Sequence, residues 1–505
     1  MTYIFFTLLA TLPVFAIAYE PFVCLDHGCI RGILKNDTRG DLYDAFLGIP
    51  FAQPPVGNLR LRNPVPIKPW GNVLNATEVK PDCLQMNALA PGSPIYGEED
   101  CLYLNVYRPQ INNKASLSPV MIYIFGGGFF SGSADPGIVG PEFFMENGEV
   151  ILVTIAYRLG PLGFLSTGDK EMPGNFGLKD QKTAIEFIKN NIYKFGGDPD
   201  LITVFGQSAG GVSTHLQVLA TPPHKKLFKH AIIMSGVATV PFGLLSTDPL
   251  EQARLQASFL GVSSFETLST RQIAKALRQA NASQLLQSGN NFKYFDVDPL
   301  TVFIPVIEQP GTGAFLTKDP MEIIKSGEYN KIPSMIGMVP NEGAVRSLSI
   351  SENPSLKEKF NDNFDDLLLM SLEFPDNSKD DYRLEQVVDY YFDGQHELNN
   401  LTSQGFTDMI TDRGFYYPFF KVKEVHRHDQ NGAPLYIYDF KYRGTLSYSF
   451  LYAGNTNNYG VVHCDDLIYL FNSPTLFPNN FAENTPDKMV SQDFVDYFVH
   501  FAVQG

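Results

Sequence analysis

Basic residues are scarce in this sequence. Its 505 residues include 38 Lys and Arg against 54 Asp and Glu, which gives a formal net charge of −16 and an isoelectric point near 5.0. A surface with this charge repels the phosphate backbone of nucleic acids and anionic lipid headgroups. The charge balance therefore argues against nucleic acid as a partner.

Signatures of metal and nucleotide sites are also missing. The sequence contains no H-E-x-x-H, and neither Gly-Lys-Ser/Thr nor G-x-G-x-x-G spacing accompanies its glycine run at 126–128. His426 and His428 lie in a charged segment that we expect to face solvent. We therefore predict neither a metal nor an organic cofactor.

Only one stretch is apolar enough to be a signal peptide or a membrane-spanning segment. Residues 1–18, "MTYIFFTLLATLPVFAIA", end in the small-x-small pattern of Ala16, Ile17 and Ala18, which indicates a secretory signal peptide cleaved after Ala18. A transmembrane anchor is the alternative, but Pro13 and the short apolar core argue against it. Since no second span and no hydrophobic C-terminal tail follow, we predict a secreted protein. We expect residues 19–505 to form one domain.

Cysteines are few, and in a secreted protein their number matters. Four of the five can pair and one is left over. Pairing between neighbours gives Cys24 with Cys29 and Cys83 with Cys101, and leaves Cys464 as a thiol. Four N-x-S/T motifs suit the same compartment and predict glycosylation at Asn36, Asn75, Asn281 and Asn400.

Apolar, strand-like runs recur along the chain, and several would be buried on both faces. These runs are "CLYLNVY" from 101, "VMIYIF" from 120, "VILVTIAY" from 150, "LITVF" from 201, "HAIIMSG" from 230, "IPSMIGMV" from 332 and "PLYIYDF" from 434. Helical segments such as 180–194 lie between them. The pattern predicts an α/β fold with a large, mixed and mostly parallel sheet flanked by helices. Polar, helix-like insertions at about 240–330 and 345–430 are expected over one end of the sheet.

The segment "TVFGQSAGGVSTHL", residues 203–216, contains G-x-S-x-G. With 42 glycines in the chain this pattern alone is weak, so its context decides. An apolar run precedes Ser208, and a helix-like segment follows the glycines. Strand, tight turn and helix are typical of a nucleophile elbow, which exposes a serine hydroxyl above a sheet edge.

A nucleophilic serine needs a base, a carboxylate that orients the base, and amides that bind an oxyanion. Glu342 follows a predicted strand in "GMVPNEGA", and His463 precedes an apolar segment in "NNYGVVHCDDLIYLF". Each residue by itself is also common in ordinary turns and loops. The glycine run in "YIFGGGFFSGS" follows a predicted strand and is the candidate oxyanion loop.

Seven segments occur in one order along the chain: "FLGIPFAQPPVGNLRLRNP" from 46, "EDCLYLNVYRP" from 99, "IFGGGFFSGS" from 124, "TIAYRLGPLGFLS" from 154, "PGNFGLKDQ" from 173, "FGGDPDLITVFGQSAGG" from 195 and "GVVHCDDLIYLF" from 460. In these segments the sequence resembles the type-B carboxylesterases, the carboxylesterase and cholinesterase family, over nearly its whole length. The resemblance implies an α/β-hydrolase fold and no cofactor.

The resemblance also implies roles for individual residues. Ser208 matches the nucleophile, Glu342 the acid and His463 the general base, while Gly127, Gly128 and Ala209 match the oxyanion amides. Cys83 and Cys101 match the first disulfide of the family. The pairs Arg60 with Glu99 and Arg158 with Asp180 match structural ion pairs.

Three features depart from the family pattern. The loop between Cys83 and Cys101 lacks the tryptophan that faces choline in cholinesterases, so we do not expect choline esters as substrates. A second family disulfide has no cysteines near "QASFLGVSS". The sequence ends at "HFAVQG", where relatives continue with a further strand and helix, so the domain is expected to be short at its C-terminus.

We therefore predict a serine hydrolase that cleaves small carboxylic esters through an acyl-enzyme, as a general or detoxifying carboxylesterase. A juvenile hormone esterase is the first alternative, although Gly211 stands where hormone esterases commonly have alanine. A non-catalytic adhesion protein with the same fold is the second. The complete set of Ser208, Glu342 and His463 argues against the second alternative.

Overall fold

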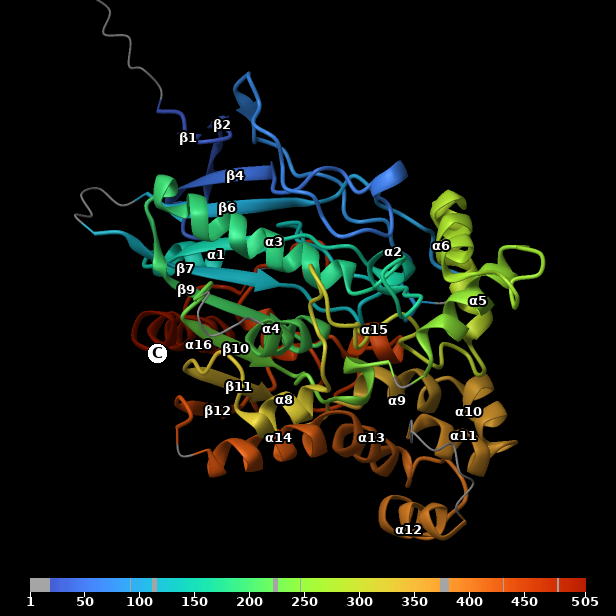
Figure 1. Cartoon of the computed structure of the whole chain (residues 1–505). Coiled ribbons are helices and arrows are strands. Elements are labelled where there is room, and N and C mark those ends of the chain that lie inside the picture. Colours follow the sequence, from blue (N-terminus) through green and yellow to red (C-terminus); the bar gives the residue numbers. More distant parts are fainter. Residues whose placement is uncertain are drawn as a thin grey trace, which may run out of the picture.

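A nine-stranded sheet lies at the centre of the computed structural model (Figure 1). The structure describes residues 19–90, 92–110, 116–220, 226–245, 247–372, 381–429, 431–478 and 481–505, so the predicted signal peptide lies outside it. The strands, in spatial order, are β12 (Leu435–Asp439), β11 (Ser334–Met338), β10 (His230–Met234), β9 (Gly197–Gln207), β7 (Ser118–Ile124), β8 (Ile151–Ile155), β6 (Tyr103–Pro109), β4 (Leu42–Pro50) and β3 (Ile33–Asn36).

The strands from β12 to β8 are parallel, and those from β8 through β6 and β4 to β3 are antiparallel. All five residues of β8, of β10 and of β11 are buried, as expected for apolar strands with both faces covered. The edge strand β12 differs, because its Tyr436 and Ile437 are exposed. The predicted large, mostly parallel mixed sheet is therefore confirmed.

The N-terminal strands were not among the predicted elements. Strands β1 (Phe22–Leu25), β2 (Gly28–Arg31) and β5 (Leu74–Asn75) form a separate three-stranded sheet. These three strands are only two to four residues long, and most of their side chains are partly or fully exposed. Such short segments have no apolar run that would distinguish them from loops.

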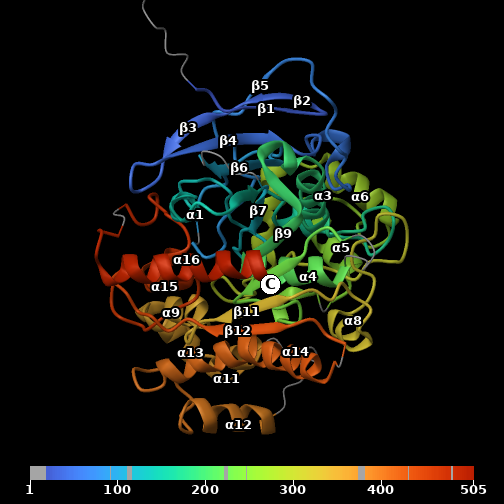
Figure 2. The ribbon, with the colours of Figure 1, turned by 90° about the vertical axis from the view of Figure 1, so that its left-hand side faces the viewer.

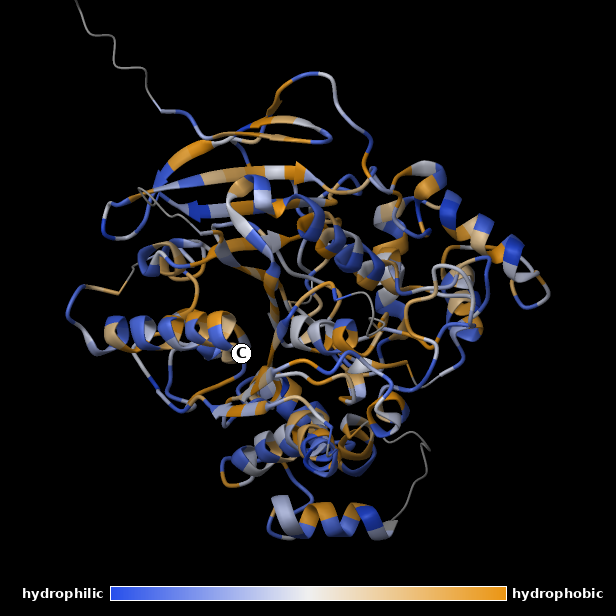
Figure 3. Cartoon of the chain, turned by 60° about the vertical axis from the view of Figure 1, so that its left-hand side comes forward, coloured by the Kyte–Doolittle hydropathy of each residue, from blue (hydrophilic) through white to orange (hydrophobic). Residues whose placement is uncertain are grey.

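Helices cover both faces of the central sheet (Figure 2). On one face lie α3 (Phe176–Asn191) and α4 (Ala209–Ala220), and α4 packs on β9 and β10. On the other face lie α1 (Glu142–Asn147) and α16 (Pro486–Gln504), which pack against each other. The apolar residues concentrate on the central strands, while the outer helices alternate between apolar and polar residues (Figure 3).

The predicted insertions are helical. The remaining helices are α2 (Gly160–Phe164), α5 (Pro249–Phe259), α6 (Thr270–Gln279), α7 (Ala282–Gln287), α8 (Pro320–Ser326), α9 (Ala344–Ser351), α10 (Pro354–Asn361), α11 (Phe364–Ser371), α12 (Asp381–Tyr391), α13 (Ser403–Thr411), α14 (Tyr417–His428) and α15 (Ser449–Ala453). Helices α9 to α13 share an apolar core of their own. In Figure 1, α5, α9 and α15 lie on the side toward which the arrows of β7 and β9 point.

The cysteines are joined as Cys24–Cys29 and Cys83–Cys101, and Cys464 is a free thiol. The four asparagines of the N-x-S/T motifs are all exposed. Across the described ranges, no helix is both long and apolar enough to span a bilayer.

Candidate active site

Ser208 occupies a sharp turn between β9 and α4. Its φ is +58°, in the left-handed region, and its backbone N–H donates to the Met234 carbonyl over 2.8 Å. Glycine is required on both sides, because a Cβ on Gly206 would lie 2.4 Å from the Gly210 carbonyl oxygen and one on Gly210 would lie 2.1 Å from that of Ile124. The predicted strand, strained turn and helix are therefore present at this serine.

Glu342 and His463 form a buried pair. The Oε2 atom of Glu342 lies 2.5 Å from Nδ1 of His463, and Oε1 accepts a hydrogen bond of 3.0 Å from the Val339 N–H. Glu342 sits in the turn between β11 and α9, while His463 precedes the 3₁₀ helix at Asp465–Tyr469. A carboxylate that accepts from Nδ1–H leaves Nε2 of a neutral imidazole as a proton acceptor.

A cavity of about 160 Å³ brings these elements together. Ser208, His463, Gly127 and Gly128 all line it. Most of the remaining wall is apolar and includes Leu89, Phe130, Pro241, Phe242, Leu300, Val345, Leu372, Ile410, Phe415 and Tyr452. A serine, an imidazole and a glycine loop in the wall of a mostly apolar cavity form the arrangement expected of an acyl-transfer site.

The glycine loop follows β7 and bends sharply. Gly127 and Gly128 have φ values of +98° and +59°, and a Cβ on Gly127 would lie 2.2 Å from the Ser131 carbonyl oxygen. The backbone can therefore approach a bound group without side chains in between. Ala209 is the first residue of α4, so its N–H is one of the helix amides without an intrahelical acceptor.

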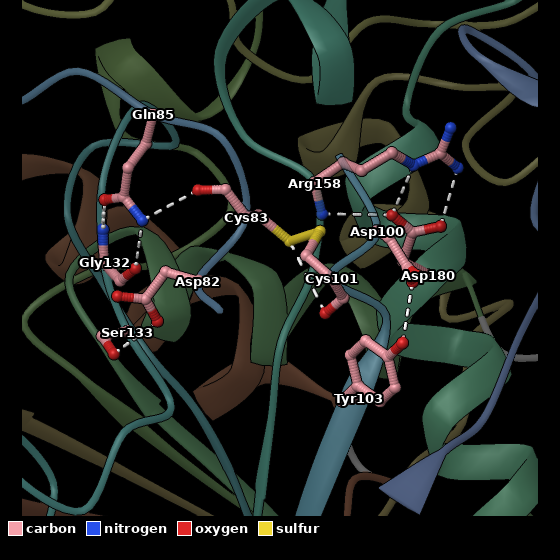
Figure 4. The surroundings of a disulfide bond; sticks show 10 residues. All are labelled: Asp82, Cys83, Gln85, Asp100, Cys101, Tyr103, Gly132, Ser133, Arg158 and Asp180. Carbon is pink, nitrogen blue, oxygen red and sulfur yellow. Dashed lines mark hydrogen bonds and ion pairs between the residues drawn. A yellow bond between two sulfur atoms is a disulfide. The ribbon is translucent and has the colours of Figure 1, made fainter. Parts of the chain in front are cut away.

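A disulfide loop supports the glycine loop (Figure 4). The buried Gln85 side chain accepts from the Gly132 N–H over 2.8 Å and donates to the Gly132 carbonyl over 2.9 Å. Gln85 lies two residues after Cys83, which is bonded to Cys101, and Asp82 accepts from the Ser133 hydroxyl over 2.6 Å. The disulfide thus anchors the residues that hold the far end of the glycine loop.

Comparison with known proteins identifies the family. The model of the carboxylesterase family matches residues 19–505. The chain belongs to the carboxylesterase family. It is 39% identical to juvenile hormone esterase of Tribolium castaneum, over 96% of this chain and 84% of that protein. It is 35% identical to venom carboxylesterase-6 of Apis mellifera, over 96% of this chain and 86% of that protein.

The fold comparison agrees. The crystal structure of juvenile hormone esterase from Manduca sexta, with OTFP covalently attached, matches with a TM-score of 0.82 and 29% identity, over 96% of this chain and 90% of that chain. The esterase therefore has the α/β-hydrolase fold and is a carboxylic ester hydrolase. Since the relatives named here are all esterases, the non-catalytic alternative has no support from them.

The surroundings of His463 in this carboxylesterase favour a charged ring. Burial lowers the pKa of His463, whereas the neighbouring Cys464 and Glu342 raise it, and the net shift is upward. Asp466, also fully buried, accepts from the Tyr438 hydroxyl over 3.1 Å, and burial raises its pKa to about 7. The Glu342 carboxylate at Nδ1 therefore stabilises the imidazolium that forms when His463 takes a proton.

Sequence reasoning missed Gln207. Its side-chain Nε2 lies 3.2 Å from Nε2 of His463, and its Oε1 accepts from the Cys464 thiol over 3.4 Å. Gln207 therefore contacts the imidazole nitrogen that is not bound by Glu342. Its place directly before Ser208 in the motif was the available signal.

The two predicted ion pairs are present with different degrees of burial. Arg158 and Asp180 are joined by two side-chain bonds of 2.7 Å and are almost fully buried. Arg60 and Glu99 are joined by two bonds of 2.5 Å and remain partly exposed. Neither pair lines the cavity, which fits the structural role that the resemblance implies.

Proposed function

We propose that Ser208 is the nucleophile of the esterase and His463 its general base. The Ser208 hydroxyl oxygen attacks the ester carbonyl carbon as Nε2 of His463 removes its proton. Glu342 holds the imidazole through Nδ1 and stabilises its positive charge. The observation that carries the proposal is the 2.5 Å contact between His463 and Glu342 beside a serine held in a left-handed turn.

The rest of the cycle follows from the same groups. The amides of Gly127, Gly128 and Ala209 bind the oxyanion that forms when the carbonyl π electrons move to oxygen. The C–O bond then breaks, and the alcohol leaves with the proton from His463. Water attacks the acyl-enzyme, again with His463 as base, and the carboxylic acid and free Ser208 are regenerated.

We propose small neutral esters as substrates, as for a general or detoxifying carboxylesterase. The cavity wall is mostly apolar, and Asp298, a carboxylate in that wall, is paired with Arg346. Trp70, the single tryptophan, stacks on His27 and donates a hydrogen bond to the Cys29 carbonyl. It does not line the cavity. The best partner for a choline cation is therefore absent from this wall.

Hydrolysis of juvenile hormone is the second candidate, favoured by the names of the relatives from Tribolium castaneum and Manduca sexta. A panel of esters varied in acyl and alcohol size, with juvenile hormone included and Ser208→Ala as blank, separates the two. Preference for the hormone by kcat/KM over simple alkyl and aryl esters would replace the general assignment.

The nucleophile is tested by intact mass. An organophosphate should add one adduct per molecule of wild-type protein and abolish hydrolysis of aryl esters, because such reagents trap an activated serine. Ser208→Ala should remain unmodified. An adduct that persists in this variant, or a wild type that stays unmodified, would remove Ser208 from the proposed role.

A further inference from the structure

One wall of the cavity is a loop at 293–301, the first part of the long segment between the 3₁₀ helix Ser288–Phe292 and α8. Tyr294, Asp298, Leu300 and Thr301 of this loop line the cavity. Two backbone hydrogen bonds of 2.7 Å, from the Tyr294 N–H to the Asp298 carbonyl and from the Asp298 N–H to the Phe295 carbonyl, close it into a turn. These bonds fix the shape of the turn but not its position against the rest of the cavity.

Arg346 of α9 ties this turn to the catalytic side of the cavity. Its Nε lies 2.8 Å from Oδ1 of Asp298, and its Nη2 lies 2.7 Å from Oδ2. Its Nη1 reaches Oδ2 of Asp296 over 3.3 Å and the Ser349 hydroxyl over 2.6 Å. The side chains of Arg346 and Asp298 are only 7% and 12% exposed. Arg346 also lies four residues after Glu342.

A buried bidentate pair of this kind determines position more than stability. The planar guanidinium group donates two parallel hydrogen bonds to a carboxylate in one orientation, so the two elements that carry the groups have one relative placement. Desolvation offsets much of the attraction between two buried charges, so the net contribution to folding is small. The pair also neutralises the charge that each group would otherwise bring to the cavity wall.

We propose that the Asp298–Arg346 pair sets substrate size selectivity by holding the wall that carries Tyr294, Leu300 and Thr301. An ester long enough to reach this wall binds to a surface that is already ordered, whereas an acetate ester does not reach it. The pair is a positioning element and takes no part in bond breaking. The inference rests on the proposed function only in that the cavity receives the ester.

The test compares p-nitrophenyl acetate, hexanoate and decanoate. The double variant Asp298→Asn with Arg346→Gln removes both charges of the pair, and Asp296 loses only its longer contact with Arg346. KM for decanoate should rise about tenfold more than KM for acetate, the size expected when one or two side chains must be ordered on binding. Arg346→Lys keeps the charge but loses the fork, so it should show an intermediate shift and serves if the double variant does not fold.

The matched control is a second Arg–Asp pair, Arg108 with Asp44, whose Nε–Oδ2 distance is 2.6 Å. It joins β6 to β4, and neither residue lines the cavity. Asp44→Asn with Arg108→Gln should leave the decanoate-to-acetate ratio unchanged. An unchanged ratio in both Arg346 variants overturns the proposal, and so does an equal loss for all three esters, which would place the effect on Glu342 through α9.

A binding measurement keeps this inference separate from the proposed function. In a Ser208→Ala background, calorimetry with 2-decanone and acetone measures how binding affinity depends on chain length, without turnover. The preference for 2-decanone should fall about tenfold when the pair is removed, and an unchanged preference overturns the proposal. If the wild type cleaves no ester while 2-decanone binding still depends on the pair, the proposed function fails and the role of the pair stands.

Discussion

At the scale of single residues, the site depends on backbone conformations that most residues avoid. Ser208, Gly127 and Gly128 all have positive φ, and so does Cys464 next to His463. A non-glycine residue in this region costs about 1–2 kcal/mol, so the surrounding contacts must compensate. Ser208 is held by the Met234 carbonyl and by α4, whose Val212 N–H donates to the Ser208 carbonyl over 2.9 Å.

The pH dependence belongs to this scale. The proposed mechanism requires neutral His463, so kcat/KM should fall as the pH drops through its pKa, which lies above the ordinary value of 6.5. Glu342→Gln removes a negative charge that raises this pKa, so the acid limb should move to lower pH. The plateau should fall about 10⁴-fold, as when the acid of a serine protease triad is made an amide.

The control for this prediction is Glu424→Gln, which removes one carboxylate from the exposed surface of α14. Its acid limb should coincide with that of the wild type. A Glu342→Gln profile with an unmoved midpoint would mean that another group titrates in the acid limb.

A second prediction at this scale concerns Gly128→Asp. A Cβ here would lie 2.3 Å from Cε1 of Phe130, so the ring must move, and the carboxylate would repel the developing oxyanion. Loss of one oxyanion donor costs about 10²–10³ in kcat, and we expect at least that loss. The melting temperature should fall only slightly, because aspartate tolerates positive φ better than most residues.

Gly128→Ala separates the two causes in this experiment. It has the same crowding and no charge, so its kcat should lie between those of the wild type and Gly128→Asp. Near-wild-type turnover in Gly128→Asp would remove this amide from the oxyanion site.

At the scale of elements, the parallel strands explain why distant segments meet. The glycine loop follows β7, Ser208 follows β9, and Glu342 follows β11. These strands run parallel within one sheet, so their carboxyl ends lie at one edge, where ligands bind in open α/β sheets. His463 reaches the same edge from the segment after α15, and the Tyr452 hydroxyl of α15 donates to its carbonyl over 3.1 Å.

The two disulfides should differ in what their removal does. They close loops with sequence separations of 18 for Cys83–Cys101 and 5 for Cys24–Cys29. In the chain-entropy model these bonds are worth about 3 and about 2 kcal/mol. Removing Cys83–Cys101 should also lower turnover, because Gln85 then holds Gly132 less firmly.

The comparison is made with two double cysteine-to-alanine variants by denaturant unfolding and ester hydrolysis. The Cys24 and Cys29 variant should keep its turnover, because that disulfide joins β1 to β2 outside the cavity. Equal turnover in both variants would mean that the Cys83–Cys101 loop does not support the glycine loop.

At the scale of the whole molecule, the net charge and the exposed sequons suit a secreted glycoprotein. We predict that the protein secreted from insect cells begins at Tyr19 and loses mass on endoglycosidase treatment. Asn→Gln at Asn36, Asn75, Asn281 and Asn400 should each remove one glycan, while the exposed Asn58, outside any such motif, is the control. Retention in the cells, or a mass insensitive to the enzyme, would contradict the prediction.

The sequence by itself determined the family, the mostly parallel sheet and the strand–turn–helix at Ser208. These features can be read from patterns along the sequence: apolar β-branched runs, glycines at fixed spacing and motifs in a fixed order. The short strands β1, β2 and β3 carried no such signal, because pairing with neighbours rather than composition makes them strands.

Only the tertiary structure decided what surrounds the proposed nucleophile. Glu342 and His463 are 121 residues apart, and only the family resemblance, not their local sequence, set them apart from ordinary loop residues. The tertiary structure places them 2.5 Å apart. The contact of Gln207 with His463, the support of Gly132 by Gln85 and the Asp298–Arg346 pair were not foreseen. Each depends on the direction of a side chain across separate elements, and packing fixes that direction, whereas residue type and spacing do not.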